Sequence, residues 1–357
     1  MCTLGTTTPM MIVSLSNIES SLLTWLLVLS IISLCVVYLF YPALVAAVAP
    51  VIRSEEVPVV SGSSAISCST GTLNKHNEPI LLSLIIPAYN EELRLTSMLQ
   101  ETYDYVTQKD CPAVSQLSQA SSHRLRPCVE FILVDDGSID QTARVFQEFS
   151  RTTDHDAPTL FRLLRLHHNV GKGAAVQTGM LAARGTFCLM VDADGATAFG
   201  PGLEAVAAFA ASHDFILGSR ADLTGTQSAQ RSPLRKLLQG AFHLLVVALV
   251  GTSEIQDTQC GFKLFRGSIV PLLFGRLHLR RWAFDTELLY RAAGVHLRLK
   301  EVNVPWHEVE GSKLNTGPLA LIQVAISMLR DMLCVRLCYS LRIWKVPKRA
   351  KEKQKDK

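Results

Sequence analysis

Basic residues are absent from the first part of this chain. No Lys or Arg occurs before Arg53, and residues 22–52 carry no charge of either sign. A secretory signal peptide needs a basic leader and a short apolar core, so this pattern excludes one. Twenty uncharged residues are enough to cross the roughly 30 Å hydrocarbon core of a bilayer as a helix. We therefore predict a short N-terminus and a membrane anchor within residues 1–52, with a span at about 22–41 and room for a longer one.

Paired cysteines are also missing. The nine cysteines form no Cys-x-x-Cys pair and are odd in number, which argues against a zinc ribbon and against a compact disulfide framework. Only 18% of residues are charged against 48% hydrophobic, and the net charge is +4. This mild basicity does not indicate a nucleic acid partner, and the apolar balance favours membrane association. Because the first cation follows the anchor, the positive-inside bias places the rest of the chain in the cytosol.

From residue 80 onward, apolar runs of strand length alternate with helical stretches. The expected strands are 81–87, 130–134, 162–166, 187–191 and 215–218, and the expected helices are 91–106, 141–150, 173–183 and 203–211. Apolar strands separated by helices indicate an α/β fold, with a mostly parallel sheet covered by helices. We expect this catalytic domain at 80–310, a linker at 53–79, and a surface insertion at 107–128.

Three further segments have interpretations related to the membrane. Residues 241–250 are nearly uncharged but too short to span, which suits an interfacial helix or a core helix. Residues 311–344 are expected to form helices that lie on the membrane or pack on the domain, because four charges within the apolar stretch 319–344 disfavour a second span. Residues 345–357 form a basic cytosolic tail. Within it, Lys353 and Lys355 match the spacing of a signal that retrieves membrane proteins to the endoplasmic reticulum.

Polar turns follow three of the expected strands. They read Pro-Ala-Tyr-Asn-Glu-Glu at 87–92, Asp-Asp-Gly-Ser at 135–138 and Asp-Ala-Asp-Gly at 192–195. Such positions meet at the carboxyl edge of a parallel sheet, where active sites form. A single acidic turn is often only a helix cap. Two carboxylates one residue apart after a buried strand, however, can hold a hard divalent cation such as Mg²⁺ or Mn²⁺, which in turn neutralises a diphosphate.

A glycine-containing loop, Asn-Val-Gly-Lys-Gly-Ala at 169–174, opens another expected helix. Its amides and Lys172 are placed to face a phosphate or a ribose, or else its glycines serve only to start the helix. The loop lacks the spacing and the Lys-Ser/Thr pair of a Walker A motif. A dinucleotide-dependent oxidoreductase is disfavoured as well, because no Gly-x-Gly-x-x-Gly turn follows the first strand.

In this order and spacing, the three turns resemble those of the family 2 glycosyltransferases of the GT-A fold, over about residues 80–310. The resemblance implies that Asp135 or Asp136 contacts the base, and that Asp192 and Asp194 serve the metal and the sugar diphosphate. The residues that it assigns to the nucleotide-sugar pocket are Pro87, Tyr89, Asn90, Glu91, Asp135, Asp136 and Lys172.

Further strings narrow the resemblance to the branch of the family that glycosylates polyprenyl phosphates. They are Asp-Ala-Asp-Gly-Ala-Thr at 192–197, Gly-Ser-Arg at 218–220, Asp-Thr-Gln-Cys-Gly-Phe-Lys at 257–263 and Arg-Trp-Ala-Phe-Asp-Thr-Glu at 281–287. The Gln-x-x-Arg-Trp string of processive polysaccharide synthases is absent, and His-Leu-Arg-Arg-Trp stands at 278–282 instead. Synthesis of long chains is therefore not expected.

This resemblance implies transfer of glucose from UDP-glucose to dolichyl phosphate, with inversion, for glycosylation at the endoplasmic reticulum. The cations expected at the acceptor phosphate are Arg220, Arg235 and Lys263, with Arg231 or Lys236 as substitutes for Arg235. The residues expected to act in catalysis are Asp192, Asp194, Arg220 and Asp285, although Asp257 and Asp285 have structural roles as an equal alternative. Two other functions stay open, a dolichyl-phosphate mannosyltransferase using GDP-mannose and a non-catalytic membrane scaffold that binds nucleotide.

Overall fold

The chain divides into two compact units, residues 1–48 and 49–357. The computed structural model describes residues 10–48, 54–57, 80–121, 128–153, 158–220, 247, 255–309 and 318–346. Arg235, Arg231, Lys236, nearly all of 241–250 and the two lysines of the proposed retrieval signal lie outside the described residues.

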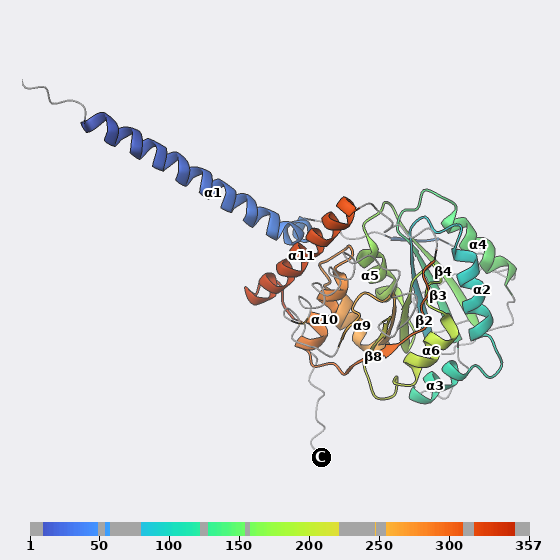
Figure 1. The fold of residues 1–357 in the computed structure, drawn as a ribbon. Helices are drawn as coiled ribbons and strands as arrows, with labels where there is room; N and C mark the ends of the chain where they lie inside the picture. The colour runs from blue at the N-terminus through green and yellow to red at the C-terminus, as the bar shows by residue number, and fades with distance from the viewer. Residues whose placement is uncertain are drawn as a thin grey trace, which may run out of the picture. The chain divides into compact units, whose positions relative to one another are not determined.

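The first unit is one long helix, α1 (Met10–Val48) (Figure 1). Its segment Leu26–Ala46 is long and apolar enough to cross a membrane, and no other helix among the described residues meets that test. The predicted span at about 22–41, with room for a longer one, overlaps this segment, and the helix continues through Pro42. Apolar side chains such as Leu34 are exposed along this segment, as suits a surface in contact with lipid.

The second unit is built on an eight-stranded sheet in the order β1-β4-β3-β2-β5-β7-β6-β8. Its strands are β1 (Ser54–Val57), β2 (Ile80–Ala88), β3 (Cys128–Asp135), β4 (Thr159–Leu166), β5 (Phe187–Val191), β6 (Phe215–Ser219), β7 (Phe262–Arg266) and β8 (Leu299–Asn303). Four neighbouring pairs are parallel, β4 with β3, β3 with β2, β2 with β5 and β6 with β8. The other three are antiparallel. The expected mostly parallel α/β sheet is confirmed.

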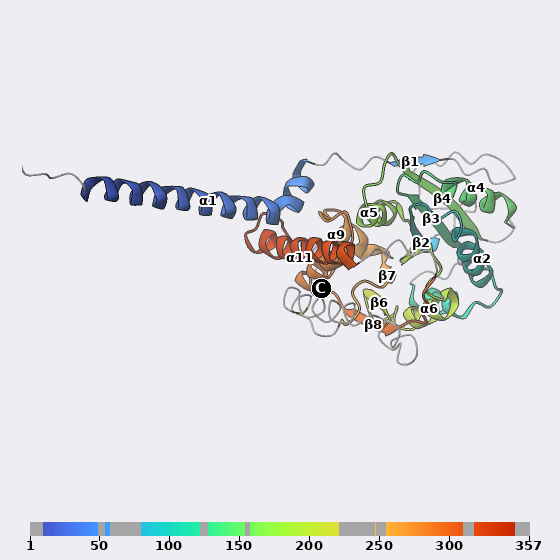
Figure 2. The same cartoon turned by 45° about the horizontal axis from the view of Figure 1, so that its top comes forward.

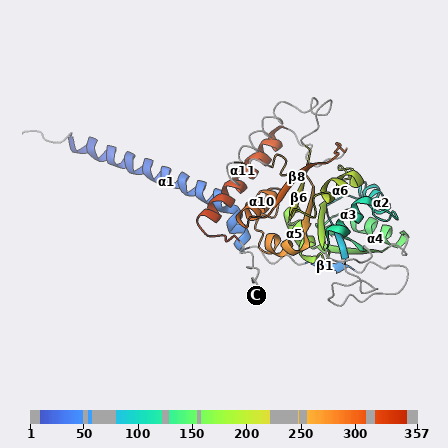
Figure 3. The same ribbon diagram turned by 90° about the horizontal axis from the view of Figure 1, so that it is seen from below.

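Helices cover both faces of the sheet (Figure 1). One face carries α2 (Leu95–Val106), α3 (Pro112–Ala120), α4 (Thr142–Thr152) and α6 (Phe199–Ala207). The other carries α5 (Lys172–Ala182), α9 (Val270–Phe274), which follows the short helix η1 (Gly267–Ile269), and α10 (Phe284–Gly294). A last helix, α11 (Pro318–Ser340), runs beside α10 (Figure 3).

The alternation of side chains along β2 explains this layering. Leu82, Leu84 and Ile86 point into the larger core beneath α2 and α6, and Ile85 points to the opposite face, towards α5. A Cβ at Gly179 of α5 would lie 2.6 Å from a methyl carbon of Ile85, so only glycine lets this helix approach so closely. The approach sets the start of α5 at the carboxyl edge of the sheet.

Two segments expected to be irregular are ordered, and both expectations need correction. Residues 54–57 of the predicted linker form β1, which pairs antiparallel with β4 at the edge of the sheet (Figure 2). The predicted insertion at 107–128 contains α3, whose Ala113 and Leu117 are wholly buried in the main core. Burial of these two side chains makes α3 part of the folded domain.

The helix expected at 311–344 has two different faces. Met332, Val335 and Cys338 of α11 are buried. Its exposed apolar side chains, at intervals of four, three and four residues along one side of the helix, are Ile322, Ile326, Leu329 and Leu333. The helix therefore packs on the domain by one side and leaves an apolar stripe on the other.

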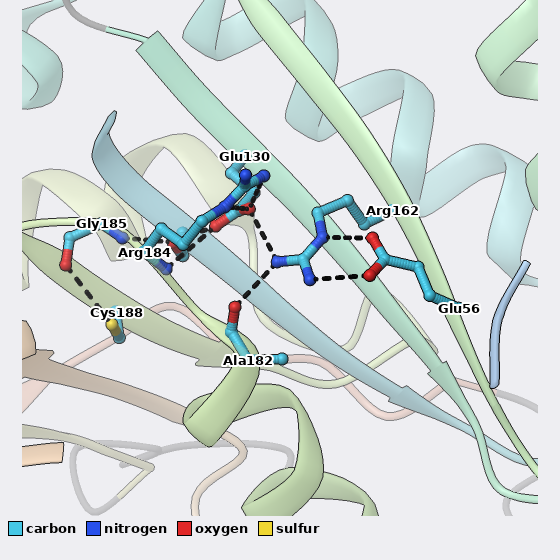
Figure 4. Close-up of polar contacts among 8 residues, drawn as sticks. Glu56, Glu130, Arg162, Ala182, Arg184, Gly185 and Cys188 are labelled. Carbon is cyan, nitrogen blue, oxygen red and sulfur yellow. Dashed lines mark hydrogen bonds and ion pairs between the residues drawn. The ribbon is translucent and has the colours of Figure 1, made fainter. Parts of the chain in front are cut away.

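A buried cluster of charges lies toward the amino ends of β3 and β5 (Figure 4). The carboxylate of Glu130 is wholly buried and accepts hydrogen bonds from Arg162 at 3.0 Å, Arg184 at 2.7 Å and the Ser83 hydroxyl at 2.6 Å. Arg162 also donates from Nε to Glu56 of β1, at 2.7 Å. The cluster thus fastens the edge strand β1 to the interior of the sheet.

Candidate active site

The first two polar turns interlock at the carboxyl edge of β2 and β3. The backbone N–H of Asn90 donates to Oγ of Ser138 at 2.9 Å, and Oδ1 of Asn90 accepts from the N–H of Ile139 at 2.9 Å. The N–H of Glu91 donates to Oγ1 of Thr142 at 2.7 Å. Asn90 has a φ of +54°, a conformation that asparagine adopts more readily than most residues. Together these bonds hold the two turns as one rigid wall.

The other residues assigned to the nucleotide pocket from the first turn lie on the same wall. Pro87 is opposite Val134 in the parallel register, and Tyr89, like Pro87, is half-buried. The Glu91 carboxylate accepts from Nε of Arg94 at 2.8 Å. All four predicted residues of this turn are therefore brought to the carboxyl edge of the sheet.

The two neighbouring aspartates of the second turn have different surroundings. Oδ1 and Oδ2 of Asp136 accept the backbone N–H groups of Val170 at 2.8 Å and Gly171 at 2.9 Å, so Asp136 holds the 169–174 loop. Burial raises the pKa of Asp136, and these two bonds oppose the rise only in part. Asp135 is wholly buried, with Oδ1 bound to the N–H of Ser138.

One oxygen of Asp135 has no hydrogen-bond donor. Its Oδ2 lies 3.2 Å from Nε of Arg165, which meets the distance of an ion pair but not the geometry of a hydrogen bond. A buried oxygen without a donor costs free energy unless a ligand supplies one. Of the two aspartates that the resemblance assigns to the base, Asp135 is thus the one with an acceptor to offer.

The Asp-x-Asp turn follows β5 and faces the start of α5. Nζ of Lys172 lies 2.6 Å from Oδ1 of Asp192, whose side chain is 34% exposed. Oδ1 of Asp194 accepts the N–H of Ala196 at 3.0 Å. Gly261 packs against the carboxylate of Asp192. A Cβ at this position would lie 1.9 Å from Oδ2 of Asp192, so only glycine fits there. The structure brings together Lys172 and the two carboxylates predicted to bind metal.

The donor set suits a hard divalent cation. Asp192 and Asp194 offer carboxylate oxygens, and Mg²⁺ is usually bound by one or two carboxylates together with substrate phosphates and waters. Among the described residues no group of three or more His, Cys, Asp or Glu side chains gathers in a way that could hold a metal alone. A metal bound here would need further oxygen ligands, from a substrate or from water.

Negative and positive side chains alternate from Asp192 into the interior, in the order Asp192, Lys172, Asp285 and Lys263. Burial lowers the pKa of Lys172, but the carboxylates of Asp192, Asp285 and Asp194 outweigh it and hold that pKa above its ordinary value. Asp285 is buried and pairs with Nζ of Lys263, itself 1% exposed. Burial raises the pKa of Asp285, against the effect of the two lysines. Lys263 and Asp285, expected at the acceptor and in catalysis, therefore form a sealed pair beneath Lys172.

Arg220 is held by a planar fork of hydrogen bonds. Its Nε and Nη2 donate to the two carboxylate oxygens of Asp257, at 2.6 and 2.8 Å. The backbone N–H of Asp257 in turn donates to Glu301 at 2.8 Å. The Arg220 guanidinium also lies 5.7 Å from the ring centre of Trp306. Arg220 is thus fixed at the end of β6, whereas Arg235, its predicted companion, lies outside the described residues.

Sequence reasoning gave no role to Gly261, Trp282 or Glu287. Gly261 packs against the carboxylate of Asp192. Trp282 is half-exposed, and its ring centre lies 5.6 Å from Nζ of Lys172. Glu287 accepts bonds from the segment that contacts the 169–174 loop. All three residues lie in the sequence strings at 257–263 and 281–287. These strings indicated that the two segments belong to the site, but they did not indicate what each residue in them does.

Comparison with known proteins adds a family match. The family model described as Glycosyl transferase family 2 matches residues 83–269. A dolichyl-phosphate beta-glucosyltransferase of Dictyostelium discoideum is 40% identical over 272 residues, which cover 75% of this chain and 77% of that protein. Those of Drosophila melanogaster and Homo sapiens are 41% and 38% identical, covering 74% of this chain and 77% and 78% of their own lengths.

Solved structures resemble the chain more distantly. Glucosyl-3-phosphoglycerate synthase from Mycobacterium tuberculosis, in complex with Mn²⁺, UDP-glucose and phosphoglyceric acid, is 13% identical with a TM-score of 0.47. The alignment covers 72% of this chain and 79% of that one. Mannosyl-3-phosphoglycerate synthase from Rubrobacter xylanophilus is 12% identical with a TM-score of 0.43, over 74% and 76% of the two chains.

Proposed function

This chain belongs to the family 2 glycosyltransferases and, within them, to the dolichyl-phosphate β-glucosyltransferases, and we propose that it transfers glucose from UDP-glucose to dolichyl phosphate. The observation that carries the proposal is the group formed by Asp192, Asp194 and Lys172 at the carboxyl edge of the sheet. Two carboxylates and one cation suit a sugar diphosphate bound with a divalent metal. The relatives' shared name supplies the sugar and the acceptor.

The acceptor brings its own nucleophile. A phosphate monoester has a second pKa of about 6, so its oxygen is largely ionised at neutral pH and needs no strong general base. This oxygen forms the new bond to C1 of glucose, while the bond from C1 to the diphosphate oxygen breaks and UDP leaves with the electron pair. Direct displacement inverts the α-linked donor and yields dolichyl β-glucosyl phosphate. The protein's tasks are to aim the two substrates and to stabilise charge.

Each side chain has a place in this proposal. Asp135 accepts from the base at the wall of interlocked turns, and Lys172 faces the donor diphosphate. Asp192 and Asp194 would hold a Mg²⁺ or Mn²⁺ ion, which would supply positive charge to offset that of the donor diphosphate.

At the acceptor, we assign the phosphate to Arg220, whose fork is oriented by Asp257. Arg235 is proposed as its companion on the strength of the sequence alone. Asp285 lies beneath Lys172 and helps to raise the pKa of that lysine, and Lys263 pairs with Asp285 in the interior.

The lipid substrate requires the site to work at a bilayer. The span in α1 supplies an anchor, and the exposed apolar stripe of α11, from Ile322 to Leu333, offers a second surface for lipid. We propose a single-pass protein of the endoplasmic reticulum membrane with its catalytic domain and C-terminus in the cytosol. The charge bias after the anchor and the spacing of Lys353 and Lys355 support this orientation.

The test uses the full chain in detergent with a short polyprenyl phosphate, with and without Mg²⁺ or Mn²⁺, and compares UDP-glucose with GDP-mannose. We expect glucosyl transfer that depends on metal and is lost in Asp194→Ala. Mannosyl transfer instead would overturn the donor and keep the mechanism. No transfer from either donor by folded protein would favour the scaffold.

A further inference from the structure

Glu287 lies at a buried junction of α10, α11 and the segment 278–282. We propose that Glu287 is a positioning residue: together with Tyr339 of α11 it holds this segment against the 169–174 loop and so sets where Lys172 meets the donor diphosphate. The inference deepens the proposed function and rests on it for the identity of the ligand. It assigns to Glu287 no contact with either substrate.

The carboxylate of Glu287 is fully occupied by donors from two parts of the chain. It is wholly buried and accepts the N–H of His278 at 2.9 Å, Nδ1 of His278 at 2.7 Å and the N–H of Leu279 at 2.8 Å. From α11, the Tyr339 hydroxyl donates to it at 3.0 Å. Because a carboxylate offers about four lone-pair sites, these bonds fix both the acid and the 278–279 backbone.

The segment held by Glu287 lies directly against the loop. The N–H of Ala174 donates to the carbonyl of Arg280 at 2.9 Å. A Cβ at Gly171 would lie 2.6 Å from that carbonyl oxygen, and a Cβ at Gly173 would lie 2.8 Å from the carbonyl oxygen of Leu279. Gly171 moreover has a φ of +110°, which side chains disfavour. The two backbones lie in close contact here. Cγ of Arg281 and Cβ of Phe284 also lie 2.9 and 2.7 Å from where a Cβ would stand at Gly171 and Gly173, so the 278–282 segment has little room to shift.

The loop is gripped from the other side as well. Both oxygens of Asp136 bind the N–H groups of Val170 and Gly171, so the loop is clamped between Asp136 and Arg280. Lys172 is the next residue, and its Nζ already lies 2.6 Å from Asp192. A shift of the 278–282 segment therefore moves the cation relative to the carboxylates that hold the metal.

The end of α11 belongs to the same packing unit. The Trp344 ring stacks on the His278 ring with centres 4.1 Å apart and planes 4° apart. Tyr339 accepts a hydrogen bond from Nη1 of the buried Arg291 at 3.1 Å while it donates to Glu287. The helix that carries the exposed apolar stripe is thereby joined through His278 and Glu287 to the loop that contains Lys172.

The test compares Glu287→Gln with Glu130→Gln in the full chain. Both wild-type carboxylates are wholly buried acceptors of several hydrogen bonds, but Glu130 lies toward the opposite end of the strands. In each variant an NH₂ group replaces an acceptor oxygen and faces donors. We expect Glu287→Gln to speed hydrogen exchange in peptides covering 169–174 by about tenfold and to raise the Kd for UDP with Mn²⁺ by about tenfold. Glu130→Gln should leave both quantities within about twofold.

Tyr339→Phe isolates the contribution of α11, since it removes only the hydroxyl; we expect about a threefold effect on both quantities. Unchanged exchange at 169–174 in Glu287→Gln would overturn the proposal, as would an equal rise in Glu130→Gln, which would mean general loosening. The exchange measurement needs no nucleotide. If the wild type fails to transfer glucose, the proposed function falls while the exchange result still decides the role of Glu287.

Discussion

The two ends of the parallel strands carry charge in different ways. Toward the amino ends of β3 and β5, the carboxylates of Glu130 and Glu56 balance the charges of Arg162 and Arg184 within the folded chain (Figure 4). At the carboxyl ends, the carboxylates of Asp192 and Asp194 lie near the single cation of Lys172, and the Asp192 side chain is one-third exposed. Balanced buried charge serves the fold, whereas an excess of partly exposed carboxylate is suited to a cation and a ligand that arrive from outside.

The largest effect is expected when one carboxylate is removed at the carboxyl ends of the strands. We expect Asp194→Ala to lower kcat/KM for glucosyl transfer by about 10³-fold or more, because the metal loses a ligand and the diphosphate loses its counter-charge. The thermal midpoint should not fall, since one like charge leaves the cluster. Transfer assays and thermal unfolding of the same preparation check both, with Asp104→Ala on the exposed side of α2 as control. A large loss of stability in Asp194→Ala would erase the distinction between the two ends.

The second test removes the carboxylate at the amino end. Glu130→Gln leaves Arg162 and Arg184 without their shared buried counter-ion, which should cost about 3 kcal/mol in the free energy of unfolding. The kcat/KM of the folded fraction should stay within about twofold of the wild type, because the site lies at the other end of the strands. Denaturant unfolding and transfer assays measure these two quantities. Glu148→Gln, an exposed change on α4, sets the baseline for stability.

An arginine that donates two hydrogen bonds to one aspartate occurs at each end of the strands, and a third test with a smaller expected effect compares the two pairs. Arg220 grips Asp257 at the carboxyl end, and Arg298 grips Asp214 at the amino ends of β6 and β8, at 2.8 Å from Nη2. Lysine keeps the charge but loses the planar fork. Arg220→Lys should raise the KM for polyprenyl phosphate about tenfold and leave the KM for UDP-glucose unchanged. Arg298→Lys should change neither KM, and an equal effect of the two variants would remove Arg220 from the acceptor site.

The strands differ in how well the sequence predicts them, and the difference follows from what surrounds each strand. The strands expected at 81–87, 130–134 and 187–191 lie within two residues of β2, β3 and β5, because buried parallel strands read as unbroken apolar runs. β1 reads Ser-Glu-Glu-Val, which has no strand pattern of its own, and it is held by its pairing with β4, by Arg162 and by the packing of Val57 on the core. β7 contains the buried Lys263, whose burial depends on Asp285, a partner 22 residues away.

The candidate site was predictable to a similar depth. The turns at strand ends showed that Asp135 and Asp192 would lie at one edge of the sheet, and Lys172 at the start of α5 contacts Asp192 there. The division of labour between Asp135 and Asp136 was not predictable, because it depends on which one reaches the amides of the 169–174 loop. Glu287 likewise owes its place to Tyr339, which comes from a helix 52 residues further along the chain.

The smallest effect is expected at Glu56, the exposed carboxylate of the Glu130 cluster at the amino ends of the strands. Arg162 donates a hydrogen bond to Glu56 and lowers the pKa of that carboxyl below its ordinary value of 4.5, although partial burial opposes the change. A lowered pKa contributes stability above 4.5 that is lost as the pH falls through the folded-state value. The Glu56 side chain is 44% exposed, so Glu56→Gln should cost less than about 1 kcal/mol at pH 7.

Once the pH falls below the lowered pKa of Glu56 in the folded state, the difference in unfolding free energy between Glu56→Gln and the wild type should disappear, because the wild-type carboxyl is then protonated too. Glu55→Gln is the matched control, since the next residue of a strand points to the opposite face of the sheet. Unfolding of both variants at pH 7 and pH 3 measures the comparison. A difference for Glu56→Gln that persists at pH 3 would mean that the contact with Arg162 stabilises β1 by packing rather than by charge, and that the amino-end cluster ends at Glu130.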